Sequence, residues 1–287
     1  MRQRNLLFKS ISAFVGAVAL GGATMVGLTA GVASAQPACP DVHWIGAAGS
    51  GERTGNVAAD DGMGRVVYKS YRDLAALVQQ TGRTITAEAV NYPATPVPED
   101  GGILDWAGFI GSVDEGTAAL GQQYQTFVAQ CPASKVVLAG YSQGAMVVHR
   151  NLHALGATPN LAAALLVADG DRLPMDPTIN IGSVVAVPEA GKGVAQDWPV
   201  LAHAPAPLPP MIGAKTISVC NVGDAVCDYD PEAEDEMNPA AVAVHTSYAR
   251  NSSSADSWTV PLYQLIAQAP APLPSPMAQP VQVTAGS

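Results

Sequence analysis

Short apolar runs alternate along this chain with segments of helical length, and this alternation restricts the fold more than any other feature. Strand-like runs occupy 42–48, 84–94, 135–140, 161–170 and 214–220. Helical patterns occupy 64–82, 112–131 and 144–156, and Ser112 with Glu115 has the spacing of a capping box. Because the apolar runs lack polar alternation, we expect strands buried on both faces. The pattern predicts an α/β fold in which helices cover a parallel sheet of about five strands.

Three segments fall outside this alternation. Residues 1–35 combine a basic start, an apolar stretch and the sequence Ala33-Ser34-Ala35, which predicts a cleaved signal peptide, with a membrane anchor as the alternative. Residues 171–213 carry few helix signals, so we expect a surface excursion between strands. The proline-rich residues 269–287 predict a disordered tail, which leaves 36–268 as the folded domain.

The charge balance limits the partners of the protein. Three of the 14 basic residues and none of the 24 acidic residues precede residue 36, so the remaining chain has a net charge of −13. This acidity argues against nucleic acid and anionic membrane surfaces as partners. We expect a monomer with no membrane span after signal cleavage. The acidic run 228–236 predicts a solvated loop, because it lacks the glycine and glutamate spacing of an EF-hand calcium site.

The cysteines indicate two disulfides. All four follow the predicted cleavage point: Cys39, Cys131, Cys220 and Cys227. An even number in an exported chain favours disulfides, and a metal site is disfavoured because Cys-x-x-Cys and His-rich spacings are absent from the sequence. From the residues alone, three connectivities remain open.

The sequence Gly140-Tyr141-Ser142-Gln143-Gly144 joins a predicted strand to a predicted helix. This is the context of a nucleophile elbow, in which flanking glycines leave room for a sharp turn that presents the serine above the carboxyl end of the strand. The backbone N–H of Gln143 would then face a developing oxyanion at the start of the helix. Ser142 is therefore a candidate nucleophile, and the alternative is a glycine-rich connection with Ser142 as an N-cap.

A serine hydroxyl needs a histidine that takes its proton and a carboxylate that orients this histidine. Position argues against four of the five histidines, which lie along the helix after the serine, in the first strand or in the excursion: His149, His153, His43 and His203. His245 follows the last strand, in the chain order of elbow hydrolases. It is either the base or an ordinary surface histidine.

Several carboxylates are candidates for the third member. Asp224 lies between Cys220 and Cys227, and a bridge between these cysteines would close a small, stiff ring around it directly after a strand. Asp169 and Asp171, which follow another predicted strand, are the rivals.

With these residues, the chain resembles the cutinase family, including the cutinase-like serine esterases exported by actinobacteria. The resemblance runs from about Ala38 to Ala267 and rests on four stretches: AAGSGERTGN at 47–56, GYSQGA at 140–145, CNVGDAVC at 220–227 and HTSY at 245–248. VNYPA at 90–94 is a softer match. The combination of G-Y-S-Q-G with C-N-x-G-D-x-x-C is far more specific than the elbow alone.

The resemblance implies a compact α/β-hydrolase sandwich of three layers and assigns roles to individual residues. It implies a triad of Ser142, Asp224 and His245, an oxyanion hole formed by Gln143 and Ser50, and the disulfides Cys39–Cys131 and Cys220–Cys227. Gly51 is an alternative to Ser50, because Ala47-Ala48-Gly49 replaces the usual Ala-Arg-Gly and the loop is one residue longer.

The resemblance also implies an activity. We expect a secreted serine esterase, with cell-wall association as a further possibility, that forms an acyl-enzyme and uses no metal or organic cofactor. Its expected substrates are short- or medium-chain lipid esters or cutin-like polyesters. The alternatives are a phospholipase or acyltransferase acting on cell-envelope lipids, and a non-catalytic envelope protein on the same scaffold.

Overall fold

A parallel sheet of six strands forms the centre of the fold, in the order β2-β1-β3-β4-β6-β5. The computed structural model describes residues 38–55, 59–98, 103–198, 206–232, 238–250 and 252–272. The strands are β1 (Val42–Ala47), β2 (Ile85–Ala89), β3 (Lys135–Tyr141), β4 (Leu161–Val167), β5 (Ile179–Ile181) and β6 (Thr216–Val219). This confirms the α/β class with one strand more than the five expected.

The central strands are buried on both faces. Alternate residues of β3 separate into two hydrophobic clusters: Val137 and Ala139 pack on one side of the sheet, and Val136 and Leu138 on the other. The same division holds in β1 and, from Ala163 onward, in β4. Because successive side chains of a strand point to opposite faces, an uninterrupted apolar run is what a sheet covered on both sides requires.

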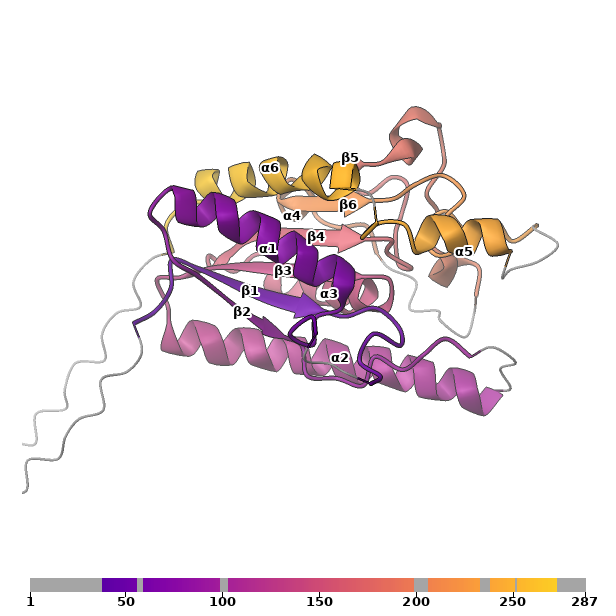
Figure 1. Cartoon of the computed structure of the whole chain (residues 1–287), viewed down its shortest axis with the longest axis horizontal. Helices are drawn as coiled ribbons and strands as arrows, with labels where there is room; N and C mark the ends of the chain where they lie inside the picture. Colours follow the sequence, from indigo (N-terminus) through magenta and orange to yellow (C-terminus); the bar gives the residue numbers. More distant parts are fainter. Residues whose placement is uncertain are drawn as a thin grey trace, which may run out of the picture. The chain divides into compact units, whose positions relative to one another are not determined.

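Helices cover both faces and complete three layers (Figure 1). One cluster includes side chains of α1 (Arg65–Gln80) and α6 (Ser252–Gln268), and the other includes side chains of α2 (Ile103–Gln130) and α3 (Gln143–Leu155). In α6, Trp258, Leu262 and Ile266 recur every fourth residue and are buried, so one stripe of the helix faces the sheet. No described helix is long and apolar enough to cross a membrane.

The predicted excursion contains regular structure. It includes β5, two 3₁₀ segments at Ser183–Ala186 and Val194–Gln196, and the short helix α4 (Pro210–Gly213). β5 pairs with β6 and is the sixth strand of the sheet. A three-residue strand gives too short an apolar run to stand out in the sequence, which is why the expected number of strands was too low.

The predicted capping box at Ser112 is wrong. Helix α2 begins at Ile103, so Ser112 lies within it. Its hydroxyl accepts a hydrogen bond from the backbone N–H of Thr95 (3.0 Å) and donates one to the side chain of Gln143 (3.2 Å). Ser112 therefore ties α2 to the elbow and starts no helix.

Two disulfides join the four cysteines, Cys39 to Cys131 and Cys220 to Cys227, as the resemblance implied. The predicted signal peptide, His203 and most of the predicted tail lie outside the described residues. The acidic run is described only as far as residue 232.

Candidate active site

The strand β3 passes directly into helix α3 through Ser142. Ser142 has φ 54° and ψ −120°, and its side chain makes no capping hydrogen bond to the helix. A Cβ atom on Gly140 would lie 2.1 Å from the carbonyl oxygen of Gly144, and one on Gly144 would lie 2.2 Å from that of Ala47. Both positions therefore require glycine, as a sharp elbow that lifts the serine above the sheet demands.

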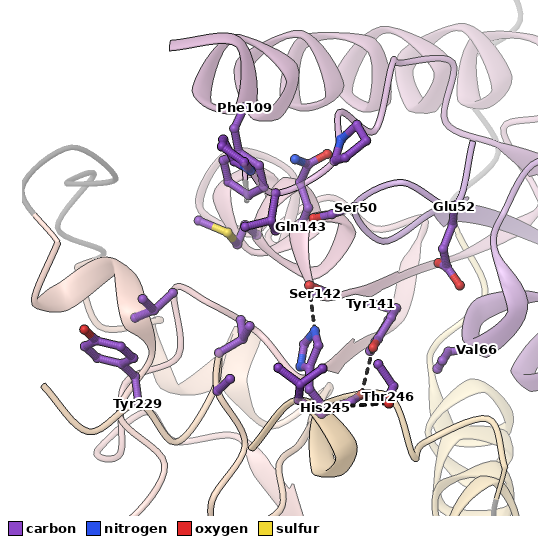
Figure 2. A pocket seen from close by; sticks show the side chains of 18 of the residues that line it. Ser50, Glu52, Val66, Phe109, Tyr141, Ser142, Gln143, Tyr229, His245 and Thr246 are labelled. Carbon is purple, nitrogen blue, oxygen red and sulfur yellow. Dashed lines mark hydrogen bonds between the residues drawn. The ribbon is translucent and has the colours of Figure 1, made fainter. Parts of the chain in front are cut away.

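Ser142, His245 and Asp224 come together at the carboxyl ends of the strands. Nε2 of His245 lies 3.0 Å from Oγ of Ser142, and Nδ1 lies 3.0 and 3.1 Å from the two carboxylate oxygens of Asp224. Figure 2 shows the imidazole directed at the serine. His245 is the last residue of helix α5 (Pro239–His245), so the three residues, separated by up to 103 positions, meet only through the fold.

Asp224 is fully buried within the ring closed by Cys220 and Cys227. Burial alone would raise the pKa of its carboxyl, but His245 and the backbone N–H groups of Val226 and Cys227 hold that pKa below the usual value. One oxygen accepts from both N–H groups, at 2.7 and 3.1 Å, and the other accepts from the hydroxyl of Tyr248 at 2.8 Å. The carboxylate is therefore kept charged and in a fixed orientation.

A tyrosine positions the histidine from the other side. The hydroxyl of Tyr141 donates to the backbone carbonyl of His245 (2.7 Å), and the two rings stack with centroids 5.2 Å apart. Tyr141 directly precedes Ser142, so the strand that presents the serine also holds the histidine.

Ser50 and Gln143 lie on the side of Ser142 away from His245 (Figure 2). The side chain of Gln143 makes hydrogen bonds with the hydroxyl of Ser112 and the carbonyl oxygen of Thr95. Its backbone N–H lies at the start of α3. Within the described part of the chain, the hydroxyl oxygen of Ser50 is buried and has no hydrogen-bond partner. A buried polar atom without a partner is costly, and a negatively charged oxygen of a substrate would satisfy it.

Gly51, the alternative to Ser50, makes a backbone hydrogen bond of its own. The backbone N–H of Gly51 donates to the carbonyl oxygen of Ala94 (2.7 Å), so it is already used. Glu52 holds the loop that contains Ser50 and Gly51. Its carboxylate accepts hydrogen bonds from the backbone N–H groups of Gly49 (2.7 Å) and Arg65 (3.0 Å). Burial raises the pKa of Glu52, and these two donors oppose the effect.

The rival carboxylates and the other described histidines are engaged elsewhere. Nδ1 of His149 lies 2.6 Å from Asp169, and the guanidinium of Arg150 binds Asp171 at 2.8 Å. His43 pairs with Glu88 and stacks on Phe127, and His153 lies 3.0 Å from the carbonyl oxygen of Ala206. The described residues contain no cluster of His, Cys, Asp or Glu side chains arranged to hold a metal ion.

A cavity of about 690 Å³ opens beside Ser142. One side is mostly apolar and is lined by Trp106, Phe109, Met146, Val194, Trp198 and Tyr229. The other side includes Glu52 and Arg65. This lining was not predicted from the sequence. The available signal was that two of the four tryptophans of the chain, Trp106 and Trp198, lie in segments without a clear core pattern.

This fold and this arrangement define an α/β hydrolase of the serine type. The family model described as Cutinase matches residues 38–262. The chain belongs to the cutinase family and is a carboxylic ester hydrolase.

Curated relatives agree with this family, and a solved structure has the same fold. The chain is 29% identical to Phospholipase Culp4 of Mycobacterium tuberculosis, over 74% of this chain and 77% of that protein. It is 28% identical to the Cutinase of Kineococcus radiotolerans, over 76% of this chain and 59% of that protein. A cutinase-like protein from Cryptococcus sp. has the same fold, with a TM-score of 0.56 and 21% identity over 79% of this chain and 93% of that structure.

Proposed function

We propose that Ser142 is the nucleophile of this hydrolase, His245 its general base and Asp224 the residue that orients the histidine. The observation that carries the proposal is the continuous hydrogen-bonded line from a buried carboxylate through an imidazole to a serine hydroxyl at 3.0 Å. Ser142 lines an open cavity, so an ester can reach its oxygen.

The reaction proceeds in two acyl transfers. Oγ of Ser142 attacks the ester carbonyl carbon while Nε2 of His245 takes the hydroxyl proton. The tetrahedral intermediate expels the alcohol, which leaves with that proton, and an acyl-enzyme remains. Water then attacks the acyl-enzyme by the same route and releases the acid and the free serine. The negative charge of Asp224 stabilises the imidazolium that forms in both steps.

The oxyanion is held by the backbone N–H groups of Gln143 and Ser50. The N–H of Gln143 lies at the start of α3, where the helix dipole favours negative charge. The buried, unpaired hydroxyl of Ser50 is a third donor to the same oxygen. Donors that are already in place stabilise the charge without reorganising, which is the source of their catalytic effect.

The substrates that fit best are lipid esters with short or medium acyl chains, because the cavity beside Ser142 has a mostly apolar side. Two disulfides support export to an oxidising compartment, with residues 1–35 as the signal peptide, 36–268 as the catalytic domain and 269–287 as a tail. The protein acts as a monomer in this proposal.

A chain-length series of p-nitrophenyl esters, run on the wild type and on Ser142→Ala, tests the proposal. We expect hydrolysis by the wild type and a loss on the order of 10³-fold or more in the variant. A fluorophosphonate probe should label Ser142 in the folded wild type. Failure to label it in folded protein would contradict the assignment and favour a non-catalytic scaffold.

A phospholipase is the second candidate. It is supported by the 29% identity to a protein named as a phospholipase. Phosphatidylcholine vesicles with acyl chains of one length provide the test, because release of a free fatty acid and a lysophospholipid would identify this activity. An added alcohol acceptor would convert part of the product to a new ester if the enzyme is an acyltransferase.

A further inference from the structure

The apolar side of the cavity includes a set of aromatic side chains that come from three distant segments. Trp106 and Phe109 belong to α2, Trp198 lies in the excursion after Val194–Gln196, and Tyr229 follows the ring closed by Cys220 and Cys227. Figure 2 shows Tyr229 and Glu52 on opposite sides of Ser142. We refer to Trp106, Phe109, Trp198 and Tyr229 as the aromatic wall.

The members of the aromatic wall contact one another directly. The ring centroids of Trp106 and Trp198 are 4.8 Å apart, and those of Trp106 and Phe109 are 5.6 Å apart. The indole N–H of Trp198 donates to the hydroxyl of Tyr229 at 2.8 Å. Because the Trp198 indole N–H and the Tyr229 hydroxyl are paired with each other, these two side chains present ring surface to the cavity.

The excursion is fastened to the rest of the site behind this wall. The N–H of Val194 donates to the carbonyl oxygen of Val226 (2.9 Å), and the N–H of Tyr229 donates to that of Lys192 (2.9 Å). These bonds connect residues 192–198 with the segment that follows Asp224. Trp198 is therefore positioned by the same segment that holds Asp224, one member of the proposed triad.

We propose that the aromatic wall is the subsite for the acyl chain and that Trp198 limits the length of chain that fits. This inference rests on the proposed function, since it assumes that an acyl group is bound to Ser142. Each methylene group that an extended hydrocarbon chain buries beyond the serine strengthens its binding by about fourfold. The gain ends where the chain meets the Trp198 indole, so longer chains must bend or remain in water.

The experiment compares chain-length profiles of kcat/KM, from acetate to palmitate esters, for the wild type, Trp198→Ala and Trp198→Phe. We expect Trp198→Ala to move the optimum of kcat/KM to longer acyl chains. It should also lower kcat/KM for the chain length preferred by the wild type by about tenfold, mainly through a higher KM. Acetate, whose acyl group has no methylene chain to bury, should be hydrolysed at an unchanged rate. Trp198→Phe, which keeps a ring but loses the indole N–H, should give an intermediate shift.

Two controls separate the subsite from general damage. Met175→Ala changes a side chain of the same excursion that is 87% exposed and does not line the cavity, so its profile should match the wild type. If Trp198→Ala unfolds, Tyr229→Phe removes only the hydroxyl that holds the indole, and it should broaden the profile. Thermal unfolding of every variant shows which profiles come from folded protein.

A second measurement detects the bound hydrocarbon chain of the ligand directly. Reaction of Ser142 with a long-chain alkylphosphonate should change the tryptophan fluorescence more than reaction with a methylphosphonate, and Trp198→Phe should remove most of that difference. The proposed acyl-chain subsite would be contradicted if the wild type and both Trp198 variants had the same chain-length profile of kcat/KM and if the two phosphonates caused equal fluorescence changes. Absence of hydrolysis by the wild type at every chain length would instead overturn the proposed function.

Discussion

The described part of the chain contains two buried or partly buried histidine–aspartate pairs that are alike in chemistry and different in surroundings. His245 and Asp224 are 3.0 Å apart, and the side chain of His245 keeps 15% of its surface exposed toward the cavity. His149 and Asp169 are 2.6 Å apart, and their side chains are only 2% and 1% exposed. Only the first pair has a serine hydroxyl within hydrogen-bonding distance of the free imidazole nitrogen among the described residues.

The surroundings of the histidine decide whether such a pair can act as a general base. Nε2 of His149 faces Asp176 at 3.7 Å and has no hydrogen bond in the described part of the chain. Burial acts to lower the pKa of His149, but the charge and hydrogen bond of Asp169 and the charges of Asp171 and Asp176 raise it to about 9. His149 is therefore a permanent cation at neutral pH, and a protonated imidazole cannot act as a base.

The largest expected effect separates the two pairs by activity. Asp224→Asn should lower kcat by about 10⁴-fold, because an amide no longer stabilises the imidazolium and favours the wrong tautomer. The matched change Asp169→Asn should leave kcat per folded molecule within about threefold, because Asp169 lies outside the cavity. Steady-state kinetics on p-nitrophenyl butyrate decides this, and equal losses in both variants would contradict the distinction.

The second effect separates them by stability. Asp169→Asn leaves the buried His149 cation without its main partner, and it should lower the free energy of unfolding by about 3 to 5 kcal/mol. His245→Gln should cost about 1 kcal/mol or less, since His245 is partly exposed. Urea denaturation followed by circular dichroism measures both, and a larger loss from the His245 variant would be the contrary result.

The third effect concerns pH. The pKa of His149 is about 9 in the folded protein and about 6.5 in the unfolded chain, so its stabilisation is complete below pH 6.5 and is lost as pH rises through 9. The charged neighbours that maintain it are Asp169, Asp171 and Asp176. The wild type should lose on the order of 3 kcal/mol of stability across this window, and His149→Gln should show a flatter curve. Equal slopes in both proteins would argue against a charged His149.

The smallest effect tests how Asp224 is held. Tyr248→Phe removes the hydroxyl that donates to Asp224 at 2.8 Å. Because Asp224 is then less firmly oriented, kcat should fall about three- to tenfold, and the free energy of unfolding should fall by about 1 kcal/mol. Kinetics and thermal unfolding on the same preparation test both values. Tyr263→Phe on α6 is the control, because Tyr263 does not line the cavity, and an equal kinetic effect there would count against the role of Tyr248.

The sequence predicted the elements whose local pattern agrees with their environment. The run at 135–140 is buried on both faces and was readable as β3, and the glycines at 140 and 144 were readable because only glycine fits there. The prediction failed where distant contacts decide the structure. Helix α6 contains Pro261, and the start of α2 contains Gly108 and Gly111, so their local signals oppose helices that packing stabilises.

The site shows the same division. His245 was predicted because the positions of the other four histidines in the sequence argued against them. The predicted ring around Asp224 favoured that carboxylate over Asp169 and Asp171. The partners of those two rivals, His149 and Arg150, lie on α3, and nothing in the spacing of the sequence indicates that they meet. The aromatic wall was missed for a similar reason, because Trp106 and Trp198 are separated by 92 positions and come together only in three dimensions.

The bridge between Cys220 and Cys227 gives the enzyme a dependence on where it matures. The ring that it closes contains Asp224, and both cysteines are buried, so thiol oxidation has to take place as the chain folds. We expect a newly made chain among reducing thiols to hold its histidine loosely and to be almost inert. Ester hydrolysis would then begin only after the thiols of Cys220 and Cys227 have been oxidised to the disulfide.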